Sequence, residues 1–317
     1  MPFHGASVIT LEAADSQGLT PRSGARRASL SGKLMSHYGA LVLACAVAVP
    51  CTDALGQLKI GADMGYRTRY VWRGLTYVDG SVIQPAVFAA LSRPSSVISA
   101  GLWTIVDVSS REKSAFGVRW FGERNVWIHY TTRLDPVDVS AGWSSYFFNL
   151  DGARGLLSDR ADTHEIYGAA RVRWGRLMPG LTGWYDIGRV KGFYLVGELA
   201  IRVPMWNGVL IPVGSLWVTG KAGLNAGQSS GERPEQHGYF SDRGVTHYEF
   251  SISTVVGYMP MGALNGAVHL EAGWIRKRDA RTRLGPHGVD RNDRAFFFGL
   301  TLTGIGPRCR PAHGVCP

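Results

Sequence analysis

The sequence predicts an all-β fold, an antiparallel up-and-down transmembrane β-barrel of about 12 strands. Three observations support this prediction: an export signal, a long series of segments in which polar and apolar residues alternate, and connections of alternating length. The predicted organisation is an N-terminal extension with a cleavable signal peptide over 1–56, a barrel over 57–305, and a short periplasmic tail over 306–317 that contains Cys and Pro.

The composition favours β structure and excludes several other classes. The 317 residues are 45% hydrophobic and include 41 Gly, 10 Trp and 12 Tyr, and their mean hydropathy is -0.02. These values fit neither a disordered chain nor a helical membrane protein. The net charge is +10, but Lys and Arg are scattered and form no basic helix or known nucleic-acid module, so nucleic acid is not an expected partner.

Residues 26–56 have the order of a secretory signal. Arg26, Arg27 and Lys33 form a basic region, an apolar run follows over 39–50, and Ala54-Leu55-Gly56 offers small residues for cleavage before Gln57. The run is about a dozen residues long, whereas a spanning helix needs about 20. A short buried helix and a lipid-modified Cys45 remain the alternatives.

Alternation begins in residues 58–74. The even positions hold Leu58, Ile60, Ala62, Met64, Tyr66, Thr68, Tyr70 and Trp72, and every charge falls on an odd position. A membrane strand needs this pattern because one face meets lipid and the other meets the lumen. The pattern recurs, with weaker examples where Pro85 and Pro212 disfavour pairing, and it predicts strands over 58–74, 82–92, 97–109, 124–134, 136–148, 163–174, 180–187, 192–203, 209–224, 245–258, 262–276 and 294–305.

Alternation alone does not say which face is inside. A soluble β-sandwich or lipocalin-like barrel would turn its apolar face inward. The connection lengths favour the membrane barrel, because short turns such as 93–96, 134–136 and 259–262 alternate with long polar segments over 110–123, 149–162, 225–244 and 277–293. One connection in the series of long ones, 188–192, is short. Membrane barrels have short periplasmic turns and longer external loops.

Aromatic residues near the predicted strand ends add to this. They suggest girdles at the membrane surfaces and comprise Tyr70, Trp72, Trp143, Trp174, Trp184, Tyr258 and Trp274.

The predicted lumen face carries charges of both signs. In a wall of low dielectric these charges should pair across neighbouring strands, because unpaired buried charge is costly. The alternative is a narrow path whose surplus Arg favours anions. The candidate lumen-lining residues are Arg67, Arg69, Arg73, Arg133, Arg171, Arg173, Arg202, Asp63, Asp138, Glu165, Glu198, Glu249, Glu271, His129 and His269.

No metal site, cofactor site or catalytic site is predicted. Cys309 and Cys316 could pair in an oxidising periplasm or remain two thiols, and neither has zinc-ligand spacing. The best hydrolase candidates are His247, Glu249 and Ser251, with Ser253 beside them. They share the lumen face, away from acyl chains, and residues two apart on a strand lie about 7 Å apart at about 3.4 Å per residue. No G-x-S-x-G elbow occurs.

The segment from Gly65 to Gly74, followed by Gln84-Pro85, resembles the opening strand of the TorF family of proteobacterial porins. The resemblance would cover about residues 57 to 305, as the later strands are similar in length and order. It implies a location in the bacterial outer membrane and a porin-like role. The long basic loops and the tail after Ile305 depart from the family pattern.

These inferences predict an outer-membrane barrel through which small polar solutes diffuse, with anions as the sharper alternative. Its partners would be outer-membrane lipids, lipopolysaccharide and those solutes, and its oligomeric state is left open. A second hypothesis is a barrel with a closed lumen that serves as a scaffold, its basic external loops facing lipopolysaccharide phosphates. A lipid-modifying hydrolase is the third.

Overall fold

The computed structural model describes residues 57–108, 123–148, 163–188, 190–204, 213–228, 239–261, 264–278 and 293–306. The chain divides into two units, Met1–Thr52 and Asp53–Pro317, and all described residues belong to the second. The predicted signal peptide, Cys309 and Cys316 lie outside the described residues. Within the described ranges, no helix has the length and apolarity needed to cross a membrane.

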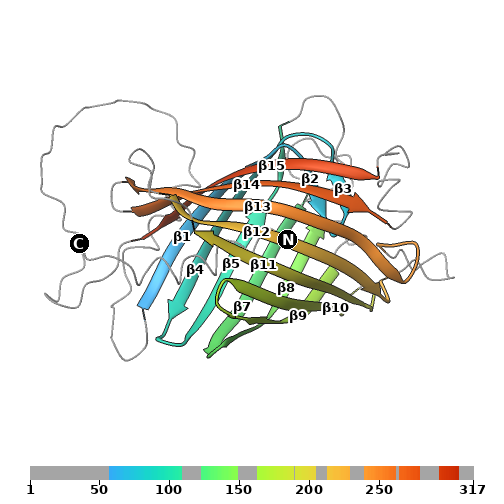
Figure 1. Cartoon of the computed structure of the whole chain (residues 1–317), viewed down its shortest axis with the longest axis horizontal. Helices are drawn as coiled ribbons and strands as arrows, with labels where there is room; N and C mark the ends of the chain where they lie inside the picture. The colour runs from blue at the N-terminus through green and yellow to red at the C-terminus, as the bar shows by residue number, and fades with distance from the viewer. Residues whose placement is uncertain are drawn as a thin grey trace, which may run out of the picture. The chain divides into compact units, whose positions relative to one another are not determined.

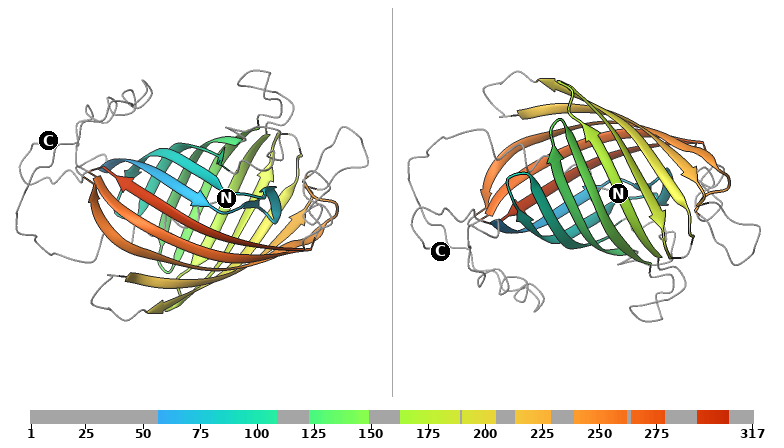
Figure 2. Two further views of the ribbon diagram at one scale, coloured as in Figure 1. Left: turned by 90° about the horizontal axis from the view of Figure 1, so that it is seen from above. Right: turned by 90° about the horizontal axis from the view of Figure 1, so that it is seen from below.

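The described strands form one closed antiparallel barrel (Figures 1 and 2). β1 pairs with β15 on one side and with β4 on the other, and this second pairing closes the sheet. β5 and β6 both pair with β4 and form one wall strand interrupted at Ile105. The predicted fold of 12 antiparallel strands is therefore confirmed. The wall strands are β1 (Gln57–Arg67), β4 (Val82–Ser92), β5 (Ser96–Thr104), β6 (Val106–Asp107), β7 (Glu123–Leu134), β8 (Val137–Phe148), β9 (Thr163–Val172), β10 (Leu177–Asp186), β11 (Phe193–Pro204), β12 (Val213–Ala226), β13 (Gly244–Met261), β14 (Leu264–Lys277) and β15 (Arg294–Ile305).

The two ends of the barrel differ in their connections. At the end where β1 begins and β15 finishes, which we call the terminal rim, the connections span 93–95, 135–136, 173–176, 205–212 and 262–263. At the opposite end, the hairpin rim, β1 leads into a small separate hairpin before β4 begins (Figure 1). The long predicted loops all fall at the hairpin rim, as the sequence indicates.

The prediction for the first strand is wrong at its end. β1 stops at Arg67, whereas alternation predicts a strand that continues to residue 74. Residues 70–78 form a hairpin of their own. Because a hairpin strand alternates like a wall strand, the pattern continues although the chain has left the wall.

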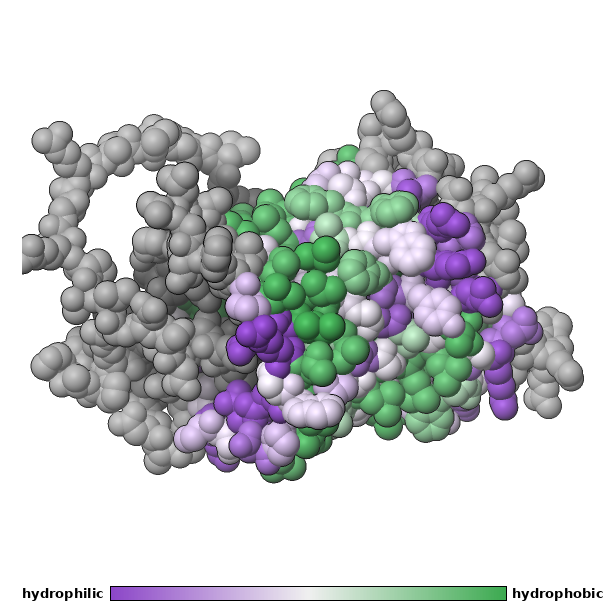
Figure 3. Space-filling view, viewed as in Figure 1, coloured by the Kyte–Doolittle hydropathy of each residue, from purple (hydrophilic) through white to green (hydrophobic). Residues whose placement is uncertain are grey.

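The outward face of the wall is apolar. Leu181 is 56% exposed, Phe250 45% and Phe298 44%, and similar exposure recurs on strands around the barrel. In Figure 3 hydrophobic residues cover the middle of the visible face, and hydrophilic residues gather at the end where β13, β14 and β15 reach the hairpin rim. The soluble alternative requires these side chains to face one another in a core, so the structure contradicts it.

Candidate functional site

A two-stranded hairpin lies between β1 and β4, and we call it the inner hairpin. It consists of β2 (Tyr70–Trp72) and β3 (Leu75–Val78), and Trp72 pairs directly with Leu75. The two-residue turn, Arg73-Gly74, has φ values of 51° and 84°. Both turn positions of the favoured type I′ hairpin require positive φ. Glycine adopts this conformation without steric cost, whereas Arg73 does so rarely.

The inner hairpin is buried inside the barrel. Every side chain of its strands is at most 9% exposed except that of Val71, which is partly buried. Tyr70 lies 5.9 Å from the ring of Trp103 on β5, and Trp72 lies 6.3 Å from that of Tyr146 on β8. On the other side, Val71 packs against the buried cluster of Ile275, Ala295 and Phe297 on β14 and β15. The hairpin therefore occupies the lumen near the hairpin rim.

This placement corrects part of the predicted aromatic girdle. Tyr70 and Trp72 are each 3% exposed, and Trp184 is 5% exposed. These three rings lie in the lumen instead of at a membrane surface. Trp174, by contrast, is 72% exposed at the terminal rim, where an interfacial ring would stand.

Arg73 fastens the tip of the inner hairpin to the wall. Its two terminal nitrogens donate to the two carboxylate oxygens of Glu165 on β9, each at 2.7 Å, and Nη1 also donates to Gln228 at 3.0 Å. Such a bidentate, charge-assisted pair is stronger than neutral hydrogen bonds. Both side chains are buried, at 4% and 1% exposure. We call Arg73 with Glu165 the clamp.

Aromatic rings complete the surroundings of the clamp. The Arg73 guanidinium carbon lies 4.3 Å from the ring centre of Trp72, 4.6 Å from that of Tyr194 and 5.0 Å from that of Trp184. Cations are attracted to such ring faces, most strongly where water is excluded. Burial alone would lower the pKa of Arg73, but the Glu165 carboxylate more than compensates and raises the pKa above its ordinary value. Arg73 therefore stays charged.

A second contact holds the hairpin to β7. The Tyr70 hydroxyl donates to Glu123 at 2.9 Å, and the Asn125 amide donates to the other Glu123 oxygen at 2.9 Å. Burial, and then the charge of Glu123, raises the pKa of Tyr70 well above its ordinary value. Tyr70 consequently remains a donor at neutral pH.

The substitution Gly74→Ala should loosen the inner hairpin. A Cβ at this position would lie 2.8 Å from the Cβ of His247, and the φ of +84° strains any other L residue. We expect a loss of about 1–3 kcal/mol in unfolding free energy, measured by urea titration in lipid vesicles. The control is Gly168→Ala, at an outward position where nothing lies within 4 Å. Equal effects of the two changes would contradict the tight docking.

Between the inner hairpin and the terminal rim, a row of charged side chains crosses the inner face of the wall. We call this row the charge ladder. Its members, in order around the wall, are Arg133, Asp138, Arg171, Glu198, Lys221 and Glu249. Each is the register partner of the next, except that one residue lies between Arg171 and Glu198. Arg171 forms an ion pair with Glu198, Lys221 pairs with Glu249 at 2.6 Å, and Arg133 lies 3.6 Å from Asp138. The signs alternate and the ladder carries no surplus charge.

A glycine allows the ladder to cross β10. Gly180 stands between Arg171 and Glu198 in the register, and a Cβ there would lie 2.9 Å from a carboxylate oxygen of Glu198. The missing side chain leaves room for Arg171 to reach over the strand. Cross-strand pairing thus matches the more conservative interpretation of the lumen charges, in which they stabilise the wall.

The structure distributes the predicted lumen residues over several places. Glu271 pairs with Arg67 at 2.6 Å. Arg173 joins Asp138 at the terminal rim, where Arg202 also lies. Asp63, His129 and His269 stand on the inward face of β1, β7 and β14, and the His129 ring is stacked on Trp127. Arg69 and Arg73 do not belong to the wall: Arg69 pairs with Asp79 beside the inner hairpin, and Arg73 forms its tip.

The structure does not assemble the hydrolase candidates into a nucleophile and base. His247 is hydrogen-bonded to Tyr194 and Thr246, and Glu249 accepts from Lys221. A different pair escaped the sequence analysis: Ser145 on β8 and His164 on β9 are hydrogen-bonded at 2.5 Å. Their positions place them on the outward face, but Ser145 is only 1% exposed, which keeps its hydroxyl from a substrate.

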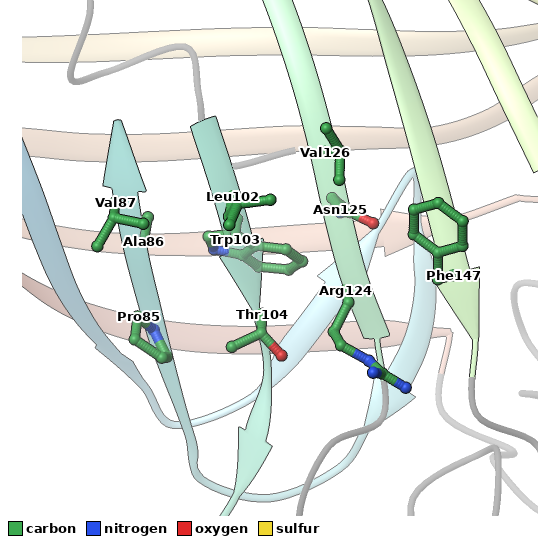
Figure 4. Close-up of a pocket in the computed structure, with 10 residues that line it drawn as sticks. All are labelled: Pro85, Ala86, Val87, Leu102, Trp103, Thr104, Arg124, Asn125, Val126 and Phe147. Atoms are coloured by element: carbon green, nitrogen blue, oxygen red, sulfur yellow. The ribbon is translucent and has the colours of Figure 1, made fainter. Parts of the chain in front are cut away.

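An apolar groove of about 400 Å³ lies beside this pair, between the hairpin-rim ends of β4, β5, β7 and β8 (Figure 4). Most of its lining residues face outward by strand alternation, among them Val87, Leu102, Val126 and Phe147. Arg124 stands at one end beside Thr104. Within the described parts of the chain, no group of three or more His, Cys, Asp or Glu could hold a metal ion.

The inner hairpin was not predicted, although the sequence contains a signal for it. Two residues, Arg73-Gly74, separate alternating aromatic segments, and this spacing is typical of a tight hairpin. Arg replaces the usual Asn or Asp of such turns, so the dipeptide reads as an ordinary strand end. The ion pairing of Arg73 with Glu165 joins residues 92 positions apart, and no local pattern reports it.

Comparisons with known proteins give likenesses of fold. No protein-family profile matches the chain, so the resemblance to the TorF family remains an expectation. No curated protein matches either. Among solved structures, the KdgM porin is 9% identical, with a TM-score of 0.42 over 77% of this chain and 98% of that one. An outer-membrane channel of Pseudomonas putida F1 is 12% identical, with a TM-score of 0.44 over 79% and 96%. Outer membrane phospholipase A of Escherichia coli is 13% identical, with a TM-score of 0.38 over 77% and 92%. At these identities and TM-scores the matches carry no functional argument.

Proposed function

We propose that the protein is a channel of the bacterial outer membrane that passes small polar solutes and is closed at the hairpin rim by its inner hairpin. The observation that carries this proposal is the inversion of ordinary protein packing: large apolar side chains point outward and charged ones line the inside. Apolar residues on the outside of a closed barrel are stable in a bilayer, and a polar interior suits water and polar solutes.

The inner hairpin supplies the closing element of this proposal. It fills the lumen at one rim. The Arg73–Glu165 ion pair fixes its tip, and the hydrogen bond of Tyr70 to Glu123 fixes its base. A 12-stranded barrel is wider than the eight-stranded barrels that side chains alone can fill. Removal of the hairpin would therefore leave a passage lined by the charge ladder. Because the ladder is balanced in sign, the proposal includes no preference for anions.

The test compares wild-type protein with Glu165→Gln in planar bilayers. The substitution keeps the size of the side chain but leaves Arg73 buried without its counter-charge, a change that costs about 3–5 kcal/mol at buried pairs. We expect rare openings for wild type and more frequent openings for the variant. The control is Glu271→Gln, which breaks the wall pair with Arg67 and leaves the clamp intact. Heat-modifiable mobility of protein from outer-membrane fractions establishes folding and location.

A closed scaffold is the second candidate, and the deep burial of the inner hairpin favours it. The two functions differ in one result. A scaffold stays silent in bilayers even after Glu165→Gln, whereas a channel opens. The proposal assigns no catalytic step and no cofactor to the protein.

A further inference from the structure

The outward face of the wall carries almost no charge. By strand alternation, the described wall strands place no Asp or Glu outward, and the outward charges are Arg124, Arg276 and Arg294. All three stand at the hairpin rim, since Arg124 lies near the start of β7, Arg276 near the end of β14 and Arg294 at the start of β15. A rim at which the outward charges of the described strands are all cationic, next to an apolar belt, is complementary to an anionic surface.

Two of these arginines face each other directly. Arg276 and Arg294 are register partners on adjacent strands, which places their Cβ atoms about 5 Å apart on the same face. Like charges at such positions repel each other unless an anion lies between them. Arg294 is 61% exposed and lies 3.8 Å from Asp293, which is itself 50% exposed. A pair this exposed adds little and leaves the guanidinium accessible.

Aromatic side chains continue from this pair toward the middle of the barrel. The next outward row holds Phe250, Trp274 and Phe296, and Tyr248 flanks Arg276 in the first row. Phe296 is 68% exposed and Phe298, below it, is 44% exposed. The same strip of surface thus has two planar cations at the hairpin rim and an apolar shelf next to them. Figure 3 shows hydrophilic residues at the hairpin-rim end of β13–β15 and hydrophobic residues toward the middle of the wall.

We propose that Arg276 and Arg294 bind the phosphate headgroup of a membrane lipid whose acyl chains lie on Phe296 and Phe298. Guanidinium groups bind phosphate through paired, charge-assisted hydrogen bonds. The aromatic shelf selects a lipid over free phosphate, because a free anion makes no use of it. The inference rests on the proposed function in so far as the barrel must lie in a bilayer.

The test is native mass spectrometry of the folded protein in nonionic detergent with added dioleoyl phosphatidic acid. We expect the double variant R276Q/R294Q to bind this lipid at least about tenfold more weakly than wild type, since two charge-assisted contacts are lost. The matched control is R124Q, which removes the third outward arginine of the described wall strands and should change binding less than about twofold. Dioleoylglycerol, which has the same chains and no phosphate, should bind wild type as weakly as the double variant binds phosphatidic acid.

Several results would overturn the lipid site. These are unchanged binding by R276Q/R294Q, an equal loss in R124Q, equal binding of dioleoylglycerol, or full competition by millimolar inorganic phosphate. Bilayer recordings separate this inference from the channel. Protein that binds phosphatidic acid but never conducts refutes only the channel, and protein that conducts without preferring phosphatidic acid refutes only the lipid site.

Discussion

Replacement of residues 69–79 by a short Gly-Ser linker should raise the single-channel conductance at least about fivefold, because a barrel of this strand number is too wide for its wall side chains alone to fill. The deletion removes both the aromatic side chains of the inner hairpin and the charge of Arg73 from the lumen. Conduction would then be limited by the charge ladder, whose alternating pairs hold their side chains against the wall.

The measurement is stepwise conductance in planar bilayers at two salt concentrations. The control replaces residues 205–212, a connection of eight residues at the terminal rim, by the same linker. Folding of both proteins is checked by heat-modifiable mobility. If the folded deletion protein conducts no better than wild type, the inner hairpin is not the barrier, and the closed scaffold becomes the better description.

The substitution Leu181→Arg should cost about 2–4 kcal/mol of unfolding free energy in lipid vesicles, the range for a cation at the bilayer midplane. Leu181 lies in the middle of β10, is 56% exposed, and stands between Ala170 and Gly197 in the register. An exposed leucine of a water-soluble protein can be replaced by Arg with little loss. The size of the loss in unfolding free energy therefore shows whether lipid or water surrounds this face.

The matched control is Leu134→Arg. Leu134 is 59% exposed and ends β7 at the terminal rim, where the same change should cost only about 0–1 kcal/mol. Urea titrations of both variants in vesicles measure the difference. Equal and small costs at the two positions would place Leu181 in water and end the membrane interpretation.

The strands could be predicted because their signal is local. β15 begins and ends where alternation places it, at 294–305, and β4 has the predicted bounds 82–92 although its alternation is weaker. The period of two follows from the geometry of a single strand, which sends successive side chains to opposite faces. Closure of the barrel can also be predicted in part, because the backbone groups of an open sheet edge would have no hydrogen-bond partners in a bilayer.

The site was less predictable because it depends on which strands are neighbours. Arg171 and Glu198 belong to one ladder only because Gly180 lies between them in the register, and their spacing in the sequence carries no trace of this. Tyr70 and Trp72 show the limit most clearly. Alternation correctly marks them as turned away from water, but the hairpin places them in the lumen instead of the membrane.

By itself, then, the sequence determined the element type, the approximate strand ends and the separation of polar from apolar faces, since each arises from interactions within a few residues. Only the tertiary structure decided that residues 70–78 fold into the barrel and that Arg73 meets Glu165. The reason is physical: alternation shows that a side chain avoids water, and both lipid and a packed lumen provide such an environment. The choice between them is made by contacts with distant strands.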